Sequence, residues 1–410
     1  MELKITKCER LEGTINISGS KNTALPILAA SLLSSKTVIL KNIPLITDVL
    51  LMLEILKSMG VKVKRENNKV KICAKHFNPM INSNDVQKLR GSYYLIGVCL
   101  ARYGLCSIKL PGGCNFMARP IDVHINVFKD LGFAVSQVNE TLYIKKATNR
   151  MNSVCINKKS VGATINALLS CQFEKIPIEI NNCSLEPEVI ETIKFLKKLG
   201  INIIVEQNTI YLKEFKIKRN VNFKIITDRI ETGSYMLLTA AIPNSKLILK
   251  NVPVDYIANI IKVVEQIGCD VILKKNTLVI KSNTVKSINL EVNEYPSFPT
   301  DLQQILSVVL LNANNTSSIK DNIYPERISH INEVKKMNAN TDYVDSKIII
   351  NNSNLTGTRV VAKDLRCAFA LIVAGSIATG ITIIEKAEIL LRGYEKPLIK
   401  LKKIGINISE

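Results

Sequence analysis

Residues 110–124 form the stretch whose residue types and spacing most clearly suggest chemistry, Leu-Pro-Gly-Gly-Cys-Asn-Phe-Met-Ala-Arg-Pro-Ile-Asp-Val-His. Cys114 follows two glycines directly, and Arg119 comes five residues later. Glycine permits backbone conformations that other residues resist, and a nearby fixed cation favours the thiolate form of a cysteine. Cys114 is therefore a candidate reactive thiol. The nearby His124 is interpreted as a structural histidine.

A second pattern places charged or capping residues at the starts of apolar helix patterns. Helix N-termini bind anions through free N–H groups and the helix dipole. Lys21, Arg90 and Arg366 stand at three such starts, and Arg119 and Arg392 are expected on loops, a set that suits phosphate and carboxylate groups. Asp or Ser at a helix start is commonly an N-cap, and capping is the favoured interpretation for Asp228 and Asp364. The six starts are Ser18–Asn22, Arg90–Gly91, Ser160–Thr164, Asp228–Gly233, Pro299–Asp301 and Asp364–Arg366.

These starts belong to a six-fold internal repeat that spans the chain. A helix pattern ending in glycine, or once in asparagine, is followed each time by a short β-rich segment, at intervals of 72, 68, 68, 70 and 67 residues. Such self-similarity indicates a repeat architecture. The repeated positions are Gly60, Gly132, Gly200, Gly268, Asn338 and Gly405.

Each repeat predicts a βαβαββ unit that closes with a hairpin. Helix patterns with an apolar stripe alternate with short β-rich runs, and turns such as Glu66–Asn68 and Glu206–Asn208 join alternating segments. Six units form one array or two groups of three. The strands before the first helix lack a unit of their own, so we expect the N-terminal strand to complete the last unit. The two lobes would then be joined by crossovers near residues 20 and 226.

Charge and cysteine content restrict the function classes. The net charge is +20, but the basic residues are scattered, and there is no basic tail or aromatic-interleaved RNA-binding signature, so nucleic-acid binding is disfavoured. None of the ten cysteines forms C-x-x-C, and no paired histidine spacing suggests zinc. The N-terminus has no signal-peptide pattern, and no apolar stretch reaches the ~18 residues that span a bilayer. We expect a cytoplasmic monomer without a membrane or nucleic-acid partner.

Eight motifs together resemble the UDP-N-acetylglucosamine 1-carboxyvinyltransferases, the enolpyruvyl transferases of peptidoglycan synthesis. In chain order they are SGSKNTALPIL, LPGGCNFMARPIDVH, KKSVGAT, EPEVIETIKFL, TDRIETGSYM, FPTDLQ, KDLRCAFAL and RGYE. The resemblance covers essentially the whole chain. It implies a two-lobed inverse α/β prism with three repeats per lobe, one lobe of residues 20–225 and the other of 1–19 with 226–410.

The resemblance implies transfer of the enolpyruvyl group of phosphoenolpyruvate to the 3-hydroxyl of UDP-N-acetylglucosamine, with release of phosphate and with no metal or other cofactor. The reaction is an addition–elimination through a tetrahedral intermediate and is the first committed step of peptidoglycan synthesis. An acid must protonate the methylene carbon and a base must accept the hydroxyl proton. Cys114 matches the acid, which is also the target of the epoxide fosfomycin, and Asp301 matches the base.

The resemblance also implies binding residues for both substrates. The positions that match phosphoenolpyruvate contacts are Lys21, Asn22, Arg119, Arg366 and Arg392, of which Lys21 and Arg392 count with the catalytic set. The positions that match UDP-N-acetylglucosamine contacts are Arg90, Arg119, Pro120, Ile121, Asp122, Val123, Lys158, Lys159, Ser160, Val161, Asp301 and Ile323.

Three alternatives are weighed against this interpretation. The sister transferase that makes 5-enolpyruvylshikimate 3-phosphate shares the fold but lacks the Pro-Gly-Gly-Cys segment. A protein that processes nucleic-acid ends should have a contiguous basic face or a nucleotidyl-accepting histidine, and the sequence indicates neither. A non-catalytic paralogue is disfavoured because the main site positions are intact. One departure from the family pattern is Tyr324-Pro325-Glu326-Arg327, in which the acidic residue is shifted by one position and its role stays open.

Overall fold

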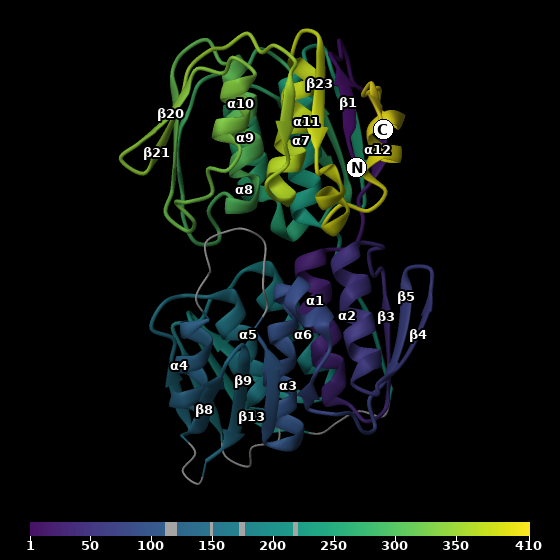
Figure 1. Ribbon diagram of the computed structural model, residues 1–410, viewed down its shortest axis with the longest axis vertical. Coiled ribbons are helices and arrows are strands. Elements are labelled where there is room, and N and C mark those ends of the chain that lie inside the picture. Colours follow the sequence, from purple (N-terminus) through teal and green to yellow (C-terminus); the bar gives the residue numbers. More distant parts are fainter. Residues whose placement is uncertain (111–120, 148–150, 172–176, 216–219) are drawn as a thin grey trace. The chain divides into compact units, whose positions relative to one another are not determined.

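The chain divides into two compact units. The computed structural model describes residues 1–110, 121–147, 151–171, 177–215 and 220–410. Gly19–Ile226 form one unit, called here the continuous unit. Met1–Ser18 and Thr227–Glu410 form the other, the discontinuous unit, which contains both chain ends (Figure 1). The described strands of each unit form three four-stranded sheets.

The continuous unit alternates short strands with helices. Its strands are β3 (Thr37–Lys41), β4 (Lys62–Glu66), β5 (Lys69–Cys73), β6 (Met80–Ile81), β7 (Leu105–Lys109), β8 (Phe133–Val138), β9 (Thr141–Lys146), β10 (Ser153–Cys155), β11 (Ile178–Asn181), β12 (Ile201–Glu206), β13 (Thr209–Phe215) and β14 (Val221–Lys224). Its α-helices are α1 (Lys21–Ala30), α2 (Thr47–Ser58), α3 (Tyr94–Tyr103), α4 (Asp122–Asp130), α5 (Val161–Ser170) and α6 (Pro187–Leu199), with 3-10 turns η1 (Ser31–Leu33), η2 (Asn84–Lys88) and η3 (Arg90–Tyr93).

The discontinuous unit has the same alternation. Its strands are β1 (Leu3–Thr6), β2 (Glu12–Asn16), β15 (Lys246–Lys250), β16 (Asp270–Lys274), β17 (Thr277–Lys281), β18 (Asn289–Val292), β19 (Ser317–Asp321), β20 (Thr341–Val344), β21 (Lys347–Ile350), β22 (Arg359–Val361), β23 (Ile381–Glu385) and β24 (Ile408–Ser409). Its helices are α7 (Arg229–Ala241), α8 (Ala258–Gln266), α9 (Gln303–Val309), α10 (Ile331–Lys336), α11 (Leu365–Ile377) and α12 (Pro397–Lys403), with 3-10 turns η4 (Val254–Tyr256), η5 (Thr300–Leu302), η6 (Leu310–Asn312) and η7 (Ala387–Arg392).

The second repeat shows the connection pattern plainly. Strand β6 runs parallel to β7 through helix α3, β7 is antiparallel to β9, and β8 and β9 form a hairpin. The resulting strand order is β6-β7-β9-β8, with α4 between β7 and β8. The predicted βαβαββ unit is therefore confirmed for this repeat.

Three sheets depart from a simple succession of repeats because each includes a strand from a distant part of the chain. Strand β1 pairs with both β23 and β24, so the N-terminal strand completes the last unit as predicted. Strand β2, however, pairs in parallel with β15 of the fourth repeat, and β14 pairs in parallel with β3 of the first. The strand that leads into α1 thus lies in the discontinuous unit, and the strand that leads into α7 lies in the continuous one.

The residues that end the second helix of each repeat adopt left-handed backbone conformations. The repeated glycines have φ values between +82° and +111°, and Asn338 has φ +70°. Glycine has no Cβ to oppose this conformation, and asparagine tolerates it better than most residues. The predicted equivalence of Asn338 to the glycines is confirmed. The hairpin turns at Asn67 and Gln207 also have positive φ values.

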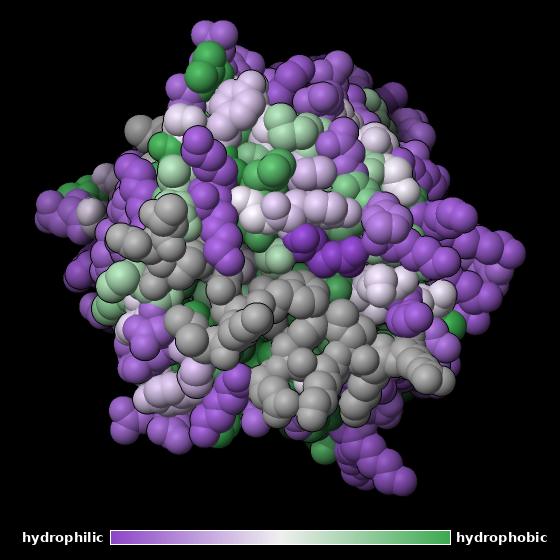
Figure 2. Space-filling view, turned by 90° about the horizontal axis from the view of Figure 1, so that it is seen from below, coloured by the Kyte–Doolittle hydropathy of each residue, from purple (hydrophilic) through white to green (hydrophobic). Residues whose placement is uncertain are grey.

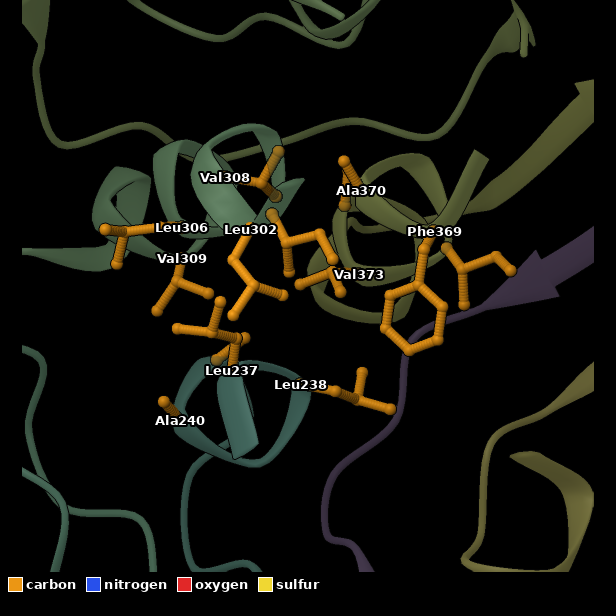
Figure 3. Close-up of a cluster of buried hydrophobic side chains, with 14 of the residues drawn as sticks. Leu237, Leu238, Ala240, Leu302, Leu306, Val308, Val309, Phe369, Ala370 and Val373 are labelled. Atoms are coloured by element: carbon orange, nitrogen blue, oxygen red, sulfur yellow. The ribbon is translucent and has the colours of Figure 1, made fainter. Parts of the chain in front are cut away.

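Three helices form the centre of the discontinuous unit. Helices α7, α9 and α11 pack together, and the residues from Arg366 to Ser376 of α11 are all buried. Figure 3 shows Leu237 and Leu238 of α7 near Val309 of α9 and Phe369 of α11. Because these helices are enclosed by close-packed aliphatic side chains, their N-terminal ends have well-defined positions. The polar site described below is built at two of these ends.

The surface carries most of the charged side chains. On the face shown in Figure 2, hydrophilic side chains surround smaller groups of hydrophobic ones. None of the helices in the described ranges is both long enough and apolar enough to cross a membrane.

Candidate active site

Four of the six predicted helix starts contain an N-cap residue whose side chain accepts from backbone N–H groups of the helix. The Ser20 hydroxyl accepts from the Thr23 N–H and the Ser160 hydroxyl from the Ala163 N–H, both at 3.3 Å. The Asp228 carboxylate accepts from two N–H groups of α7, and the Asp364 carboxylate from two of α11. The capping interpretation of both aspartates is confirmed. Each cap satisfies N–H groups that have no partner inside their helix.

The other two starts differ from the prediction. Arg90 begins the 3-10 turn η3, and helix α3 itself starts only at Tyr94. Asp301 lies inside the 3-10 turn η5 that precedes α9, and its carboxylate caps no helix. Asp301 caps no helix because its carboxylate oxygens accept hydrogen bonds from two guanidinium groups rather than from backbone N–H groups.

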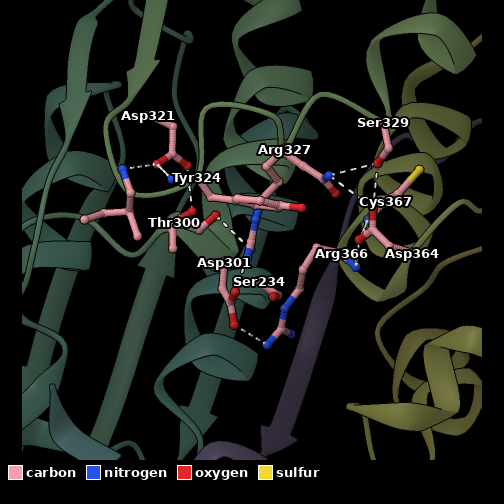
Figure 4. A network of polar contacts seen from close by, with 12 residues as sticks. Ser234, Thr300, Asp301, Asp321, Tyr324, Arg327, Ser329, Asp364, Arg366 and Cys367 are labelled. Carbon is pink, nitrogen blue, oxygen red and sulfur yellow. Dashed lines mark hydrogen bonds and ion pairs between the residues drawn. The ribbon is translucent and has the colours of Figure 1, made fainter. Parts of the chain in front are cut away.

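Asp301, Arg327 and Arg366 form a charged cluster at the start of α9 (Figure 4). Nη1 of Arg327 donates to Oδ1 of Asp301 at 2.5 Å, and Nη2 of Arg366 donates to Oδ2 at 2.8 Å. The side chains are 22% exposed for Asp301, 11% for Arg327 and 8% for Arg366. The carboxylate is therefore held on both oxygens, yet part of it still reaches solvent.

The two arginines control the ionisation of Asp301. Burial alone would raise the pKa of this carboxyl, but the charges and hydrogen bonds of Arg366 and Arg327 outweigh it and hold the pKa well below its usual range. Burial lowers and Asp301 raises the pKa of Arg366, and the net change is upward. Asp301 and Arg366 are consequently both charged at neutral pH.

Arg366 is also supported by a buried tyrosine. Its Nη1 donates to the Tyr394 hydroxyl at 3.2 Å, and the same hydroxyl lies 2.7 Å from the Ser234 hydroxyl. The Tyr394 ring stacks on Phe369 at a centroid distance of 4.8 Å. A guanidinium held by a carboxylate and a packed phenol has little rotational freedom, so it presents its remaining donors in a fixed direction.

A second layer of polar contacts ties the segments of this cluster together. Asp321 accepts from the Thr300 hydroxyl at 2.6 Å and from the Tyr324 N–H at 2.8 Å. The Ser329 hydroxyl donates to Asp364 at 2.5 Å, which links the segment of Arg327 to the cap of the Arg366 helix. Asp301, Arg327 and Arg366 thus lie on three segments that are connected side chain to side chain (Figure 4).

Two further predicted residues lie in the discontinuous unit. Arg392 is half-buried and ends the 3-10 turn η7, so the prediction of a loop at this position was wrong. Ile323 is 41% exposed, and its N–H already donates to Asp321 at 3.0 Å. If its backbone binds a substrate, its carbonyl oxygen is the group that is suited to this. Glu326 is exposed, whereas its neighbour Arg327 contacts Asp301.

The continuous unit places Lys21 beside a buried acid. Its ammonium lies 2.8 Å from Oδ2 of Asp48, which stands in the first turn of α2. The Lys21 side chain is 17% exposed and that of Asp48 only 3%. Asn22 follows at the start of α1 and is half-buried. A cation at a helix N-terminus, held by an acid behind it, is suited to meeting a phosphate group in front.

His124 brings two other predicted segments together. Its Nδ1 lies 2.9 Å from the Asn166 amide nitrogen of α5, and a Cβ added to Gly162 would lie 2.9 Å from its Nε2. Burial, with a smaller effect of Arg90, lowers its pKa to about 4. The structural interpretation of His124 is therefore confirmed. The contact holds the segment Ile121–Val123 close to the start of α5.

The remaining predicted positions are more open or lie outside the described ranges. Arg90, Asp122 and Lys158 are exposed, and Ile121, Val123, Lys159, Ser160 and Val161 are half-buried. Cys114, Arg119 and Pro120 lie outside the described residues. The candidate acid and one candidate phosphate ligand therefore stay predictions from the sequence.

Arg327 and Asp48 are the two residues of these clusters that the sequence did not assign. Asp48 has no signal of its own, because it stands 27 residues from Lys21 in a helix pattern rich in leucine. Arg327 stands in the segment that departs from the family pattern, and in that segment the pattern points to the shifted acid Glu326 instead.

A buried histidine close to the cluster makes unfolding sensitive to acid. His330 lies 2.6 Å from the Ser307 hydroxyl, and burial, partly offset by Asp364, lowers its pKa to about 4. A histidine that titrates near pH 6.5 in the unfolded chain stays neutral in the folded protein until the pH is much lower. Its contribution to the free energy of unfolding is therefore fully present above pH 6.5 and is lost as pH falls to about 4. We expect the discontinuous unit to lose about 3 kcal/mol of stability over this range.

His330→Gln should flatten this acid dependence, which urea unfolding at a series of pH values would measure. His76→Gln is the matched control, since the His76 side chain is exposed. An unchanged slope in the His330 variant would contradict the assignment.

Comparison with known proteins first defines the class. The family model for EPSP synthase (3-phosphoshikimate 1-carboxyvinyltransferase) matches residues 5–401, and this chain belongs to that family. The fold is similar to that of the enolpyruvyl transferase NikO from Streptomyces tendae, with a TM-score of 0.91 at 19% identity and coverage of 100% of this chain and 98% of that one. It is also similar to EPSP synthase from Acinetobacter baumannii, with a TM-score of 0.78 at 16% identity and full coverage of both chains. The predicted two-lobed α/β fold is confirmed.

Curated relatives then narrow the comparison. The UDP-N-acetylglucosamine 1-carboxyvinyltransferase of Wolbachia sp. subsp. Brugia malayi (strain TRS) is 37% identical, over 97% of this chain and 96% of that protein. The UDP-N-acetylglucosamine 1-carboxyvinyltransferase 2 of Staphylococcus aureus (strain MRSA252) is 34% identical, over 99% and 98%. The resemblance inferred from the sequence motifs is thereby confirmed.

Proposed function

We propose that this chain transfers the enolpyruvyl group of phosphoenolpyruvate to the 3-hydroxyl of UDP-N-acetylglucosamine and releases phosphate. The observation that carries the proposal is the identity of 34–37% over almost the full length to proteins named for this activity. The Asp301 cluster and the Lys21–Asp48 pair support it, since they supply a carboxylate and cations of the kinds that the reaction requires. The reaction is an early step of peptidoglycan synthesis.

The transfer needs one proton to arrive and another to leave. Cys114 protonates the methylene carbon of phosphoenolpyruvate, while the sugar oxygen bonds to the adjacent carbon and passes its proton to Asp301. The tetrahedral intermediate then loses phosphate together with a proton from the new methyl group, which restores the double bond. Lys21 and Arg119 bind the phosphate, Arg366 faces the carboxylate, and Arg392 faces both.

The acceptor is bound mainly by two segments, and His124 holds the described part of the first one, Ile121–Val123, close to the second. The residues in question are Arg119–Val123 and Lys158–Val161, together with Arg90, Asp301 and Ile323. The N-terminus of α5, with Lys158 and Lys159 just before it, is suited to a diphosphate because it combines free N–H groups with positive charge. The cytoplasmic location and the monomeric state expected from the sequence stay predictions.

Phosphate release tests the proposal. The purified chain, incubated with phosphoenolpyruvate, should release phosphate when UDP-N-acetylglucosamine is added and should not do so with shikimate 3-phosphate. The second acceptor distinguishes this activity from that of EPSP synthase, after which the family is described. No release, or equal release with both acceptors, would overturn the proposal.

A further inference from the structure

We propose that Arg327 is a positioning residue for the reaction and fixes the Asp301 carboxylate. Arg366, the other arginine that holds Asp301, also binds the substrate. The inference rests on the proposed function, because it assigns Asp301 as the base and Arg366 as a ligand of the phosphoenolpyruvate carboxylate. It adds a role for a residue that stands in the segment where this chain departs from the family pattern.

The contacts of Arg327 are those of a fixed support. Its Nη1 donates to the carbonyl oxygen of Thr300 at 3.1 Å as well as to Asp301. Its guanidinium carbon lies 5.3 Å from the centroid of the Tyr324 ring. The guanidinium therefore grips the backbone of η5 and the carboxylate that η5 carries, so it controls both the position and the rotation of that carboxylate.

The segment that carries Arg327 is itself anchored at both ends. Before it, Asp321 accepts from the Tyr324 N–H and from the Thr300 hydroxyl, which joins this segment to η5. After it, Ser329 donates to Asp364, the cap of α11. Since both anchors are buried carboxylates, neither Arg327 nor Asp301 can move without breaking charge-assisted hydrogen bonds.

Arg366 has a different set of contacts. It holds Asp301 through Nη2 and Tyr394 through Nη1, and a guanidinium has five N–H donors in all. A carboxylate held by two full positive charges is a weak base. When the carboxylate of phosphoenolpyruvate binds Arg366, the charge of this arginine is shared between two anions, and Asp301 becomes more basic. Arg327 meanwhile keeps the carboxylate aimed at the acceptor hydroxyl.

The charged groups around Asp301 come from several elements. Arg327 comes from the segment after β19 and Arg366 from α11. Arg366 is in turn faced by Tyr394 and, from the start of α7, by Asp228. Asp321 contacts Thr300, the residue next to Asp301. Of these, Arg327 is the one whose removal changes the charge at Asp301 without removing a proposed substrate ligand.

The test is the pH dependence of kcat/KM for UDP-N-acetylglucosamine in Arg327→Gln and Arg327→Lys. One neighbouring arginine lowers a carboxyl pKa by roughly 1–3 units, so Arg327→Gln should move the acidic limb of the profile upward by about 1 unit or more. It should also lower kcat by about 10- to 100-fold because the base is less well oriented. Arg327→Lys keeps the charge, so it should lower kcat while leaving the limb in place.

Arg359→Gln is the matched control, because this arginine also pairs with two carboxylates but is 53% exposed on β22. Equal activity losses in both Arg327 variants without any movement of the limb would indicate a merely structural role and overturn the proposal, as would wild-type kinetics in Arg327→Gln. Should Arg327→Gln fail to fold, carbon-13 NMR titration of the Asp301 carboxyl in the wild type and in Arg327→Lys tests the proposal instead. We expect Asp301 to titrate over the same pH range in both proteins.

The same NMR titration separates this inference from the proposed function, since it needs no turnover. A wild-type protein that releases no phosphate but whose Asp301 stays ionised far below the ordinary carboxyl range would overturn the proposed function and still support the positioning role of Arg327. An Asp301 that titrates in the ordinary range in the wild type would overturn that positioning role.

Discussion

Asp301→Asn is expected to lower kcat for enolpyruvyl transfer by about 10²- to 10⁴-fold, the range typical for loss of a general base. An amide has nearly the same shape as a carboxylate but cannot accept the hydroxyl proton. It also cannot balance Arg327 and Arg366, which both donate to Asp301 in the structure. The measurement is steady-state phosphate release with saturating UDP-N-acetylglucosamine.

Asp342→Asn is the matched control for this variant. Asp342 lies on β20 in the same unit and pairs with Lys335, but its side chain is 63% exposed. Its replacement should leave kcat unchanged. Asp301→Asn with a normal circular dichroism spectrum and wild-type kcat would show that Asp301 is not the base.

The repeat could be predicted from the sequence because its signals are local. A glycine or asparagine at a left-handed position, a serine or aspartate at a helix start and an alternating hairpin each depend on a few adjacent residues. Gly200 at the end of α6 and Asp364 at the start of α11 show that such signals place the ends of elements well. The same logic fails for β2 and β14, whose sheet partners are decided by where the chain crosses between units.

The candidate site was predictable only in part, because its partners are distant in the chain. Asp301 is 26 residues from Arg327 and 65 from Arg366. No spacing rule connects such positions. The packing of α9 against α11 brings Asp301 close to Arg366, whereas the contacts of Asp321 with Thr300 and of Ser329 with Asp364 bring Arg327 to Asp301. The family resemblance predicted Asp301 and Arg366 as site residues. In the segment 324–327 it pointed to the acid Glu326, whereas in the structure Arg327 is the residue of this segment that contacts Asp301.

The predicted loop at Arg392 was wrong, and for a related reason the helix predicted to start at Arg90 starts there with a 3-10 turn that precedes α3. Both residues lie in 3-10 turns, which have weak sequence signals since they are short and poorly distinguished from loops or from the first turn of a helix.

Lys400→Met is expected to give the largest loss of stability, about 3 kcal/mol, because it leaves a buried carboxylate without its cation. Lys400 lies 2.5 Å from Glu231, whose side chain is only 2% exposed. The other Glu231 oxygen accepts from the Ser18 N–H at 2.8 Å. For a unit of this size the loss corresponds to a decrease in Tm of roughly 6–12 °C, which differential scanning calorimetry would measure.

The pH dependence of this variant identifies the cause. Burial raises the pKa of Glu231 despite Lys400, and removal of the lysine should raise it further. A buried carboxyl whose pKa is raised in the folded state destabilises the protein least at pH values below its unfolded-state pKa. Stability is then lost as pH rises through the folded-state pKa. Lys400→Met should therefore approach the wild-type Tm at acid pH and diverge from it towards neutral pH.

The double variant Lys400→Met with Glu231→Gln separates the charge from the packing. Once no buried charge is left, much of the lost stability should return, because replacing a whole buried ion pair is far less harmful than removing one partner. Asp342→Asn, which breaks an exposed pair, should change stability by no more than about 1 kcal/mol. If Lys400→Met had the same Tm deficit at every pH and the double variant recovered nothing, the lysine would stabilise this unit through its packed aliphatic chain rather than through its charge.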